Sequence, residues 1–293
     1  MTREYKYFVT DAFADRSFVG NPSGVVLTQG NMSEDEMIKA ARELNYSETT
    51  CIRKLDKDIY DIRYFSPTQE VDLSVHAALS TFWTLAERGY IDNREEKRSV
   101  LQYTKAGQLH VDITFHKDEV KFIDIELPSM SILYDVEDRE SVAAAFELDV
   151  EEIGIGEAIN PVVIDNGIAT MLIPIKERKS LLTVVPKRRR MKELSKRYHC
   201  LSYHLFYYDS ASNTADQRNF SPAIGVWEEA GTGTGSGAMY YYLRSKHVFS
   251  ADHLVARQGQ EIGRPSEIYV SEKAGRIYVG GTARIVMEGI MRI

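Results

Sequence analysis

The pentapeptide Arg63-Tyr64-Phe65-Ser66-Pro67 recurs 155 residues further along the chain as Arg218-Asn219-Phe220-Ser221-Pro222. Each copy ends a strand-like run, and each is followed about ten residues later by small residues and then an apolar helical pattern. A repeat at this distance, with matching elements on both sides, indicates a duplication of one structural unit. We therefore predict two similar lobes, each with strands around a central helix.

The two central helices carry the predicted architecture. Residues 77–86 are apolar on nearly all sides, and a surface helix would show a polar face, so this helix is expected to be enclosed. Residues 237–243 take the same place in the second half. We place the first lobe at residues 1–128 and the second at 129–293, with the option that the last C-terminal strand packs back onto the first lobe. The N-termini of both helices are expected to face a shared cleft.

A shorter helix is predicted from residue 33 onward. Ser33 can cap the first turn, and Glu36, three residues later, completes a capping box. Apolar residues follow at helical spacing up to Leu44, and Asn45 is a suitable left-handed stop. This signature predicts a surface helix that ends at residue 44.

Composition excludes several classes of protein. The chain has 293 residues, with 36 basic and 43 acidic side chains and a net charge of −7, so we expect no nucleic-acid partner. No apolar run approaches the roughly 18 residues of a membrane-spanning helix, and the charged first residues do not resemble a signal peptide. The two cysteines cannot form a disulfide scaffold, which favours a cytoplasmic protein with free thiols.

The strongest local signal for chemistry is the glycine-rich stretch that begins at Glu228-Glu229 and ends at Gly237. Glycines at alternate positions, interleaved with hydroxyl groups and placed before a helix, expose backbone amides that can bind a carboxylate or a phosphate. Ala238 stands where a nucleotide P-loop needs lysine, and the Rossmann glycine spacing is absent. A flexible loop without a ligand remains the alternative.

Three titratable residues are candidates for proton transfer, and each has a structural alternative. His76 begins the first central helix, where the helix dipole disfavours its charged form, and it serves either as a neutral proton-relay group or as a satisfied core histidine. Glu48 points either into a cleft or to solvent from its strand. Glu229 is either a site residue or a surface acid before the glycine-rich stretch.

Other polar runs are interpreted as structural. The basic run Lys187-Arg188-Arg189-Arg190 is typical of a solvated helix face. His199, Cys200 and His204 lack a second pair with zinc spacing, so we predict no metal site.

These features together resemble the phenazine biosynthesis PhzF-like family, which shares the diaminopimelate epimerase fold. The likeness spans the whole chain and rests on motifs that occur in the family's order. They are Val9-Thr10-Asp11-Ala12-Phe13 with Gly20-Asn21-Pro22, Asn45-Tyr46-Ser47-Glu48-Thr49-Thr50, Arg63-Tyr64-Phe65-Ser66-Pro67, Ser74-Val75-His76-Ala77-Ala78, the stretch from Gly225 to Met239, and Gln258-Gly259 with Gly263-Arg264-Pro265-Ser266. The resemblance implies an α+β fold with two pseudo-symmetric lobes and an active site in the cleft between them.

The resemblance also implies roles for individual residues. Glu48 would be the general acid/base that moves a proton between substrate carbons, with His76 and Glu229 beside it. The substrate carboxylate would be held by backbone amides and hydroxyls of the two helix N-termini; the substrate-binding set is Ser47, Val75, Gly233 and Thr234. The family's chemistry is a cofactor-free isomerisation of trans-2,3-dihydro-3-hydroxyanthranilate. The resemblance also implies a cytoplasmic, biosynthetic enzyme that forms a homodimer.

Several positions depart from the family pattern. The family's Asp is Glu229 here, its Pro is Ala230, its Ser is Thr234, and the Gly before the histidine is Val75. Valine adds bulk near the expected ligand, which favours a flatter or smaller substrate.

The related racemases use two facing cysteines, and this chain has no cysteine at those positions, so two-thiol chemistry is not expected. We expect an isomerase of a small carboxylate. The alternatives are a binding protein that has lost catalysis and another epimerase or lyase chemistry.

Overall fold

The structure, a computed structural model, describes residues 2–156 and 158–293 and separates the chain into two compact units. Unit 1 consists of Met1–Pro128 and Tyr278–Ile293, and unit 2 of Ser129–Ile277. Residues 278–293 were expected in the second lobe, with the option that the last strand returns to the first. These residues belong to unit 1, because β18 (Ala283–Arg292) pairs with β1 (Glu4–Ala12) and covers what would be an open sheet edge.

Unit 1 is a mixed sheet in the order β18-β1-β2-β3-β4-β6-β7-β8, and the end of β17 pairs with β8. The remaining strands of this unit are β2 (Asn21–Leu27), β3 (Thr49–Asp56), β4 (Ile59–Phe65), β5 (Glu70–Val71), β6 (Lys97–Thr104), β7 (Gly107–His116), β8 (Glu119–Glu126) and the part of β17 (Arg276–Gly281) from Tyr278 onward.

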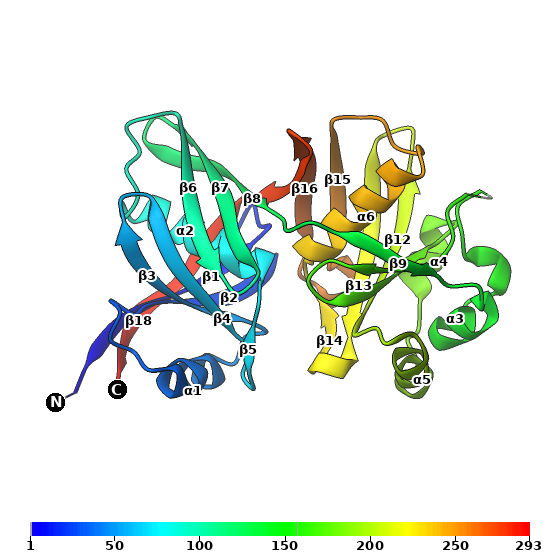
Figure 1. The fold of residues 1–293 in the computed structure, drawn as a ribbon, viewed down its shortest axis with the longest axis horizontal. Coiled ribbons are helices and arrows are strands. Elements are labelled where there is room, and N and C mark those ends of the chain that lie inside the picture. Colours follow the sequence, from blue (N-terminus) through cyan, green and yellow to red (C-terminus); the bar gives the residue numbers. More distant parts are fainter. Residues whose placement is uncertain (1, 157) are drawn as a thin grey trace. The chain divides into compact units, whose positions relative to one another are not determined.

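Helix α2 (Val75–Glu87) is the centre of unit 1. It contacts β1, β2, β3, β7, β8 and β18, and every residue from Val75 to Ala86 is buried. Figure 1 shows it among the strands of this unit. Side chains that are apolar on all faces can only be stabilised by such enclosure, so the predicted central helix is confirmed.

Helix α1 (Glu34–Leu44) lies outside the sheet, against β3 and β4 (Figure 1). Its capping box joins Ser33 and Glu36, and Asn45 ends the helix with a left-handed φ of 55°. Both predicted ends of this helix are therefore confirmed.

Unit 2 has the sheet order β9-β10-β11-β12-β13-β15-β16. Helix α6 (Gly233–Ser245) contacts β11 and β16. Residues of three further helices, α3, α4 and α5, pack with the sheet in an apolar core that includes Phe146, Tyr203 and Phe220. The other elements are β9 (Ser131–Asp135), α3 (Arg139–Phe146), β10 (Val162–Asp165), β11 (Ala169–Pro174), α4 (Arg178–Thr183), α5 (Arg188–Tyr198), β12 (Ser202–Asp209), β13 (Thr214–Ser221), β14 (Val226–Glu229), β15 (His253–Gln258) and β16 (Ser266–Lys273); three short 3-10 turns are η1 (Val150–Glu152), η2 (Pro222–Ile224) and η3 (Gln260–Ile262).

The predicted duplication is visible in the strand pairing. From β1 to β7, neighbours in unit 1 pair antiparallel, parallel, antiparallel, parallel and antiparallel. From β10 to β16, neighbours in unit 2 follow the same alternation. In each unit a short strand and the buried helix come after the repeated pentapeptide, so the repeat in sequence is a repeat in topology.

The repeated arginine explains why the pentapeptide occurs twice. Arg63 makes two hydrogen bonds to Glu70 of β5, at 2.6 and 2.7 Å, and Arg218 makes two to Glu228 of β14, at 2.8 and 3.0 Å. Each guanidinium also lies over the phenylalanine two residues later, at 5.1 and 5.0 Å from the ring centre. The pair ties each short strand to the strand before it, directly ahead of the central helix.

No helix among the described residues is long and apolar enough to cross a membrane.

The two arginine pairs differ in burial, and this predicts different costs of removal. Arg218→Met should lower the free energy of unfolding by about 3 kcal/mol or more, because it leaves a buried carboxylate at Glu228 without its cation. Arg63→Met should cost only about 1 kcal/mol, because the Arg63 side chain is 27% exposed and Lys105 still pairs with Glu70. Urea denaturation of the two variants measures these changes. Equal losses in the free energy of unfolding would contradict the conclusion that the two arginine pairs differ in burial.

Candidate active site

Glu48 and His76 are brought together in unit 1. Glu48 is 8% exposed and directly precedes β3, and His76 is 4% exposed in the first turn of α2. Atom Oε2 of Glu48 lies 3.2 Å from Nε2 of His76. The structure therefore turns Glu48 into the protein rather than to solvent, and it gives the carboxyl group an imidazole neighbour.

The imidazole of His76 is held from both sides by hydroxyl groups. Ser47 Oγ lies 3.4 Å from Nε2, and Ser74 Oγ lies 3.3 Å from Nδ1. Burial lowers the pKa of His76 to about 3, so the ring is neutral at physiological pH. A proton on Nε2 would leave Nδ1 to accept from the Ser74 hydroxyl.

The first turn of α2 offers backbone donors at the same place. Val75 is the first residue of this helix and is buried, and the N-cap residue Ser74 makes no side-chain hydrogen bond to the helix. The positive end of the helix therefore keeps amide groups that can bind an anion.

Glu229 lies at the end of β14 in unit 2, directly after Glu228, the partner of Arg218. Its Oε2 accepts a 2.7 Å hydrogen bond from the Thr232 hydroxyl. Desolvation raises the pKa of Glu229, and the Thr232 hydrogen bond opposes part of that rise. A carboxyl group with a raised pKa can hold a proton nearer to neutral pH, which suits acid/base chemistry.

Gly233 and Thr234 lie in the first turn of α6, ahead of residues 237–243, where the central helix of the second lobe was expected. The helix begins earlier than expected because its glycines permit close packing: a Cβ atom at Gly235 would come within 2.3 Å of Nδ1 of buried His204. The N-cap residue Thr232 makes no side-chain hydrogen bond to the helix. The amides of the glycine-rich stretch are thus presented by a rigid helix end rather than by a loop.

The structure groups the candidate residues by unit. Glu48, His76, Ser47 and Val75 lie in unit 1, and their mutual arrangement is the one described above. The residues of unit 2 are Glu229, Gly233 and Thr234. That the two groups act on one substrate stays a prediction.

Two residues that hold Glu229 were not singled out from the sequence. Thr232 stands three residues after Glu229, a spacing from which a hydroxyl can reach back to the carboxylate. Gln258 is the third inward position of β15 after Leu254 and Ala256, and a polar residue at such a buried position was the available signal.

Both cysteines are buried in apolar surroundings. Burial raises the pKa of Cys51 to about 12 and also raises the pKa of Cys200. Both thiols therefore stay protonated at neutral pH and pack as small hydrophobic groups.

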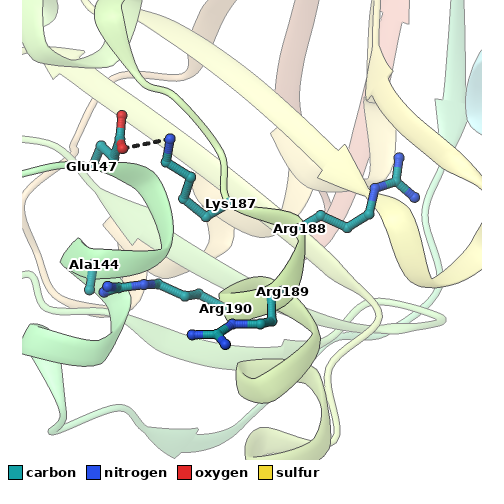
Figure 2. A pocket seen from close by; sticks show the side chains of 6 residues that line it. All are labelled: Ala144, Glu147, Lys187, Arg188, Arg189 and Arg190. Carbon is teal, nitrogen blue, oxygen red and sulfur yellow. Dashed lines mark ion pairs between the residues drawn. The ribbon is translucent and has the colours of Figure 1, made fainter.

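The basic run at the start of α5 lines a cavity of about 480 Å³ with Ala144 and Glu147 (Figure 2). Lys187 pairs with Glu147 at 2.5 Å, while Arg188 points away from this pair and lies over the ring of Trp227. None of the predicted site residues lines this cavity. Within residues 2–156 and 158–293, no cluster of three or more His, Cys, Asp or Glu has the arrangement of a metal site.

Comparison with known proteins connects this geometry to a family. Residues 10–289 match the family described as phenazine biosynthesis-like protein, PhzC-PhzF. An uncharacterized isomerase of Clostridium acetobutylicum is 32% identical, over 98% of each chain. The trans-2,3-dihydro-3-hydroxyanthranilate isomerase of Pseudomonas aeruginosa is 26% identical, over 97% of this chain and 98% of its own.

Solved structures agree with the family match. A phenazine biosynthesis protein of the PhzF family from Bacillus anthracis has a TM-score of 0.84 and 27% identity, over 99% of this chain and 100% of its own. A hydroxyproline epimerase of Agrobacterium vitis, at 12% identity and a TM-score of 0.69 over 99% of this chain and 93% of its own, shares the fold alone. The expected α+β, diaminopimelate epimerase-like fold class is confirmed, and the chain belongs to the phenazine biosynthesis-like (PhzC-PhzF) family.

Proposed function

We propose that this protein is an isomerase that moves a proton between carbon atoms of a small, carboxylate-bearing substrate by general acid/base catalysis without a cofactor. The observation that carries the proposal is the buried pair of Glu48 and His76, with 3.2 Å between Oε2 and Nε2. A carboxylate next to a neutral imidazole, away from bulk water, has the donor and acceptor that such a transfer needs.

In this mechanism Glu48 takes the proton from one substrate carbon and returns it to another. The neutral ring of His76 cannot act as a cationic acid at physiological pH, because its pKa is lowered to about 3. Its role is to hold Glu48 and a polar substrate group by hydrogen bonds, with Ser47 and Ser74 fixing the ring. Glu229, whose pKa is raised, is the second carboxyl group that serves the same reaction.

The substrate's carboxylate is assigned to a helix start. The amides of Val75 in α2, and of Gly233 and Thr234 in α6, belong to first turns whose N-cap side chains leave the helix uncapped. Positive helix ends stabilise a bound anion, and the Thr234 hydroxyl adds a donor.

The proposed substrate class follows from a relative. The Pseudomonas aeruginosa relative is named for its action on trans-2,3-dihydro-3-hydroxyanthranilate, which carries a carboxylate. At 26% identity this supports the class of substrate, and the valine at position 75 favours a flatter or smaller member of it.

Glu48→Gln should abolish the proton transfer. With trans-2,3-dihydro-3-hydroxyanthranilate in deuterated water, proton NMR should show conversion or deuterium at a ring carbon with the wild type. The variant should be slower by about 100-fold or more, because an amide cannot accept the carbon-bound proton.

Glu119→Gln is the matched control for this experiment, since Glu119 is an exposed glutamate at the start of β8 and should keep full activity. Deuterium exchange that survives Glu48→Gln would contradict the role of Glu48. Tight carboxylate binding without turnover in either protein would favour a binding protein on the same fold.

The neutral state of His76 predicts a pH dependence of stability. The folded-state pKa of about 3 lies below the usual 6.5, so the unfolded chain binds an additional proton as pH falls below about 6.5. The contribution of His76 to the free energy of unfolding should therefore fall by about 2 kcal/mol between pH 7 and pH 5.

Urea denaturation at the two pH values measures this loss. His76→Asn should reduce the difference between pH 7 and pH 5, whereas His116→Asn, at an exposed position, should leave it unchanged. A wild-type protein whose difference is unaffected by His76→Asn would show that the imidazole is not held neutral by the fold.

A further inference from the structure

A network of buried side-chain hydrogen bonds connects to Glu229 in unit 2, and no step of the proposed reaction uses the whole network. Its members come from β12, β13, α6 with its N-cap residue, and β15, and each is at most 8% exposed. They are His204, Gln217, Thr232, Ser236 and Gln258. Buried polar groups at this density are costly unless every donor meets an acceptor, so the direction of each bond is informative.

The backbone fixes the orientation of the Gln258 amide. Its Oε1 accepts from the Thr232 backbone N–H at 3.0 Å, and its Nε2 donates to the Glu229 carbonyl oxygen at 2.8 Å. A backbone N–H can only donate and a carbonyl can only accept, so the amide cannot be turned around without losing both bonds.

The second hydrogen on Nε2 of Gln258 then fixes the Thr232 hydroxyl. Nε2 donates to Oγ1 of Thr232 at 3.0 Å, and Oγ1 lies 2.7 Å from Oε2 of Glu229. Because the hydroxyl oxygen accepts from Gln258, its single proton is directed to Glu229.

Gln217 and His204 form the other end of this hydrogen-bond network. Gln217 Nε2 donates to Oε1 of Gln258 at 2.7 Å, which turns Oε1 of Gln217 toward Nε2 of His204 at 3.1 Å. Nδ1 of His204 lies 3.2 Å from Oδ1 of Asn219, and the ring packs against Gly235 of α6. The hydrogen bond from Gln217 therefore adds to the two backbone contacts that fix the Gln258 amide.

We propose that Gln258 is a positioning residue that directs the Thr232 hydroxyl proton onto Oε2 of Glu229, which leaves Oε1 as the oxygen that exchanges protons with the substrate. The inference deepens the proposed function, since Glu229 is useful there only if one oxygen is kept for the substrate. It assigns to Gln258 and Thr232 a role in the site that neither would have as packing alone.

The test measures the pKa of Glu229 directly, by carbon-13 NMR of the glutamate carboxyl groups, with the signal assigned by its loss in Glu229→Gln. Thr232→Val should increase the proton affinity of Glu229 by roughly tenfold or more, because the carboxylate loses a hydrogen bond to its charged form. Thr232→Ser keeps the hydroxyl and should retain the wild-type value. Gln258→Met should increase the affinity in the same direction.

The double variant Thr232→Val with Gln258→Met separates a relay from two independent effects. If Gln258 acts through the Thr232 hydroxyl, the double variant should show no larger change than Thr232→Val alone. An additive change, or a wild-type pKa in Gln258→Met, would overturn the proposal. Gln258→Leu repeats the measurement should Gln258→Met fail to fold.

Gln102→Met is the matched control, because Gln102 is a fully buried glutamine in unit 1 that accepts from Tyr64 and should not affect Glu229. The measurement needs no substrate. Absence of deuterium exchange in the wild type, with the expected pKa changes in the variants, would contradict the proposed function and the substrate role of Oε1. It would leave only the action of Gln258 on Glu229 through Thr232.

Discussion

The enclosure of a helix that is apolar on every side is the constraint on which unit 1 depends. Helix α2 must be surrounded by other elements. The strands that contact it come from distant parts of the sequence: β1, β2, β3, β7, β8 and β18. Because the whole helix is fixed, its first turn is fixed too, and His76 sits where water is excluded. The lowered pKa of His76 is therefore a consequence of the same packing that stabilises the fold.

Duplication has given each unit the same solution with different polar residues at the helix start. The arginine pair that ties the short strand to its neighbour is kept in both, as Arg63 with Glu70 and Arg218 with Glu228. Beyond it, unit 1 presents a histidine between two serines, and unit 2 presents a glutamate held by a threonine. The scaffold is common, and the difference in chemistry is confined to a few side chains next to a buried helix.

The glycine-rich stretch shows how the two levels of structure are linked. The sequence pattern alone predicts the helix only from residue 237 onward, and glycine is less favourable than alanine in a helix by about 1 kcal/mol per residue. In the structure the helix already includes Gly233, and Gly235 is required because His204 leaves no room for a side chain. Tertiary packing therefore overrides local propensity, and it places the amide groups that an anion would bind in a defined position.

The sequence contained the architecture, the ends of α1, the enclosed helix and the family, because these depend on local spacing and on a repeat that is legible along the chain. Glu48, His76 and Glu229 could also be chosen from their motifs. The contact of Glu48 with His76 joins residues 28 positions apart, and the hold of Gln258 on Thr232 joins residues 26 positions apart. Such contacts exist only after the strands have paired, because hydrogen-bond direction and desolvation depend on neighbours that the chain brings together by folding.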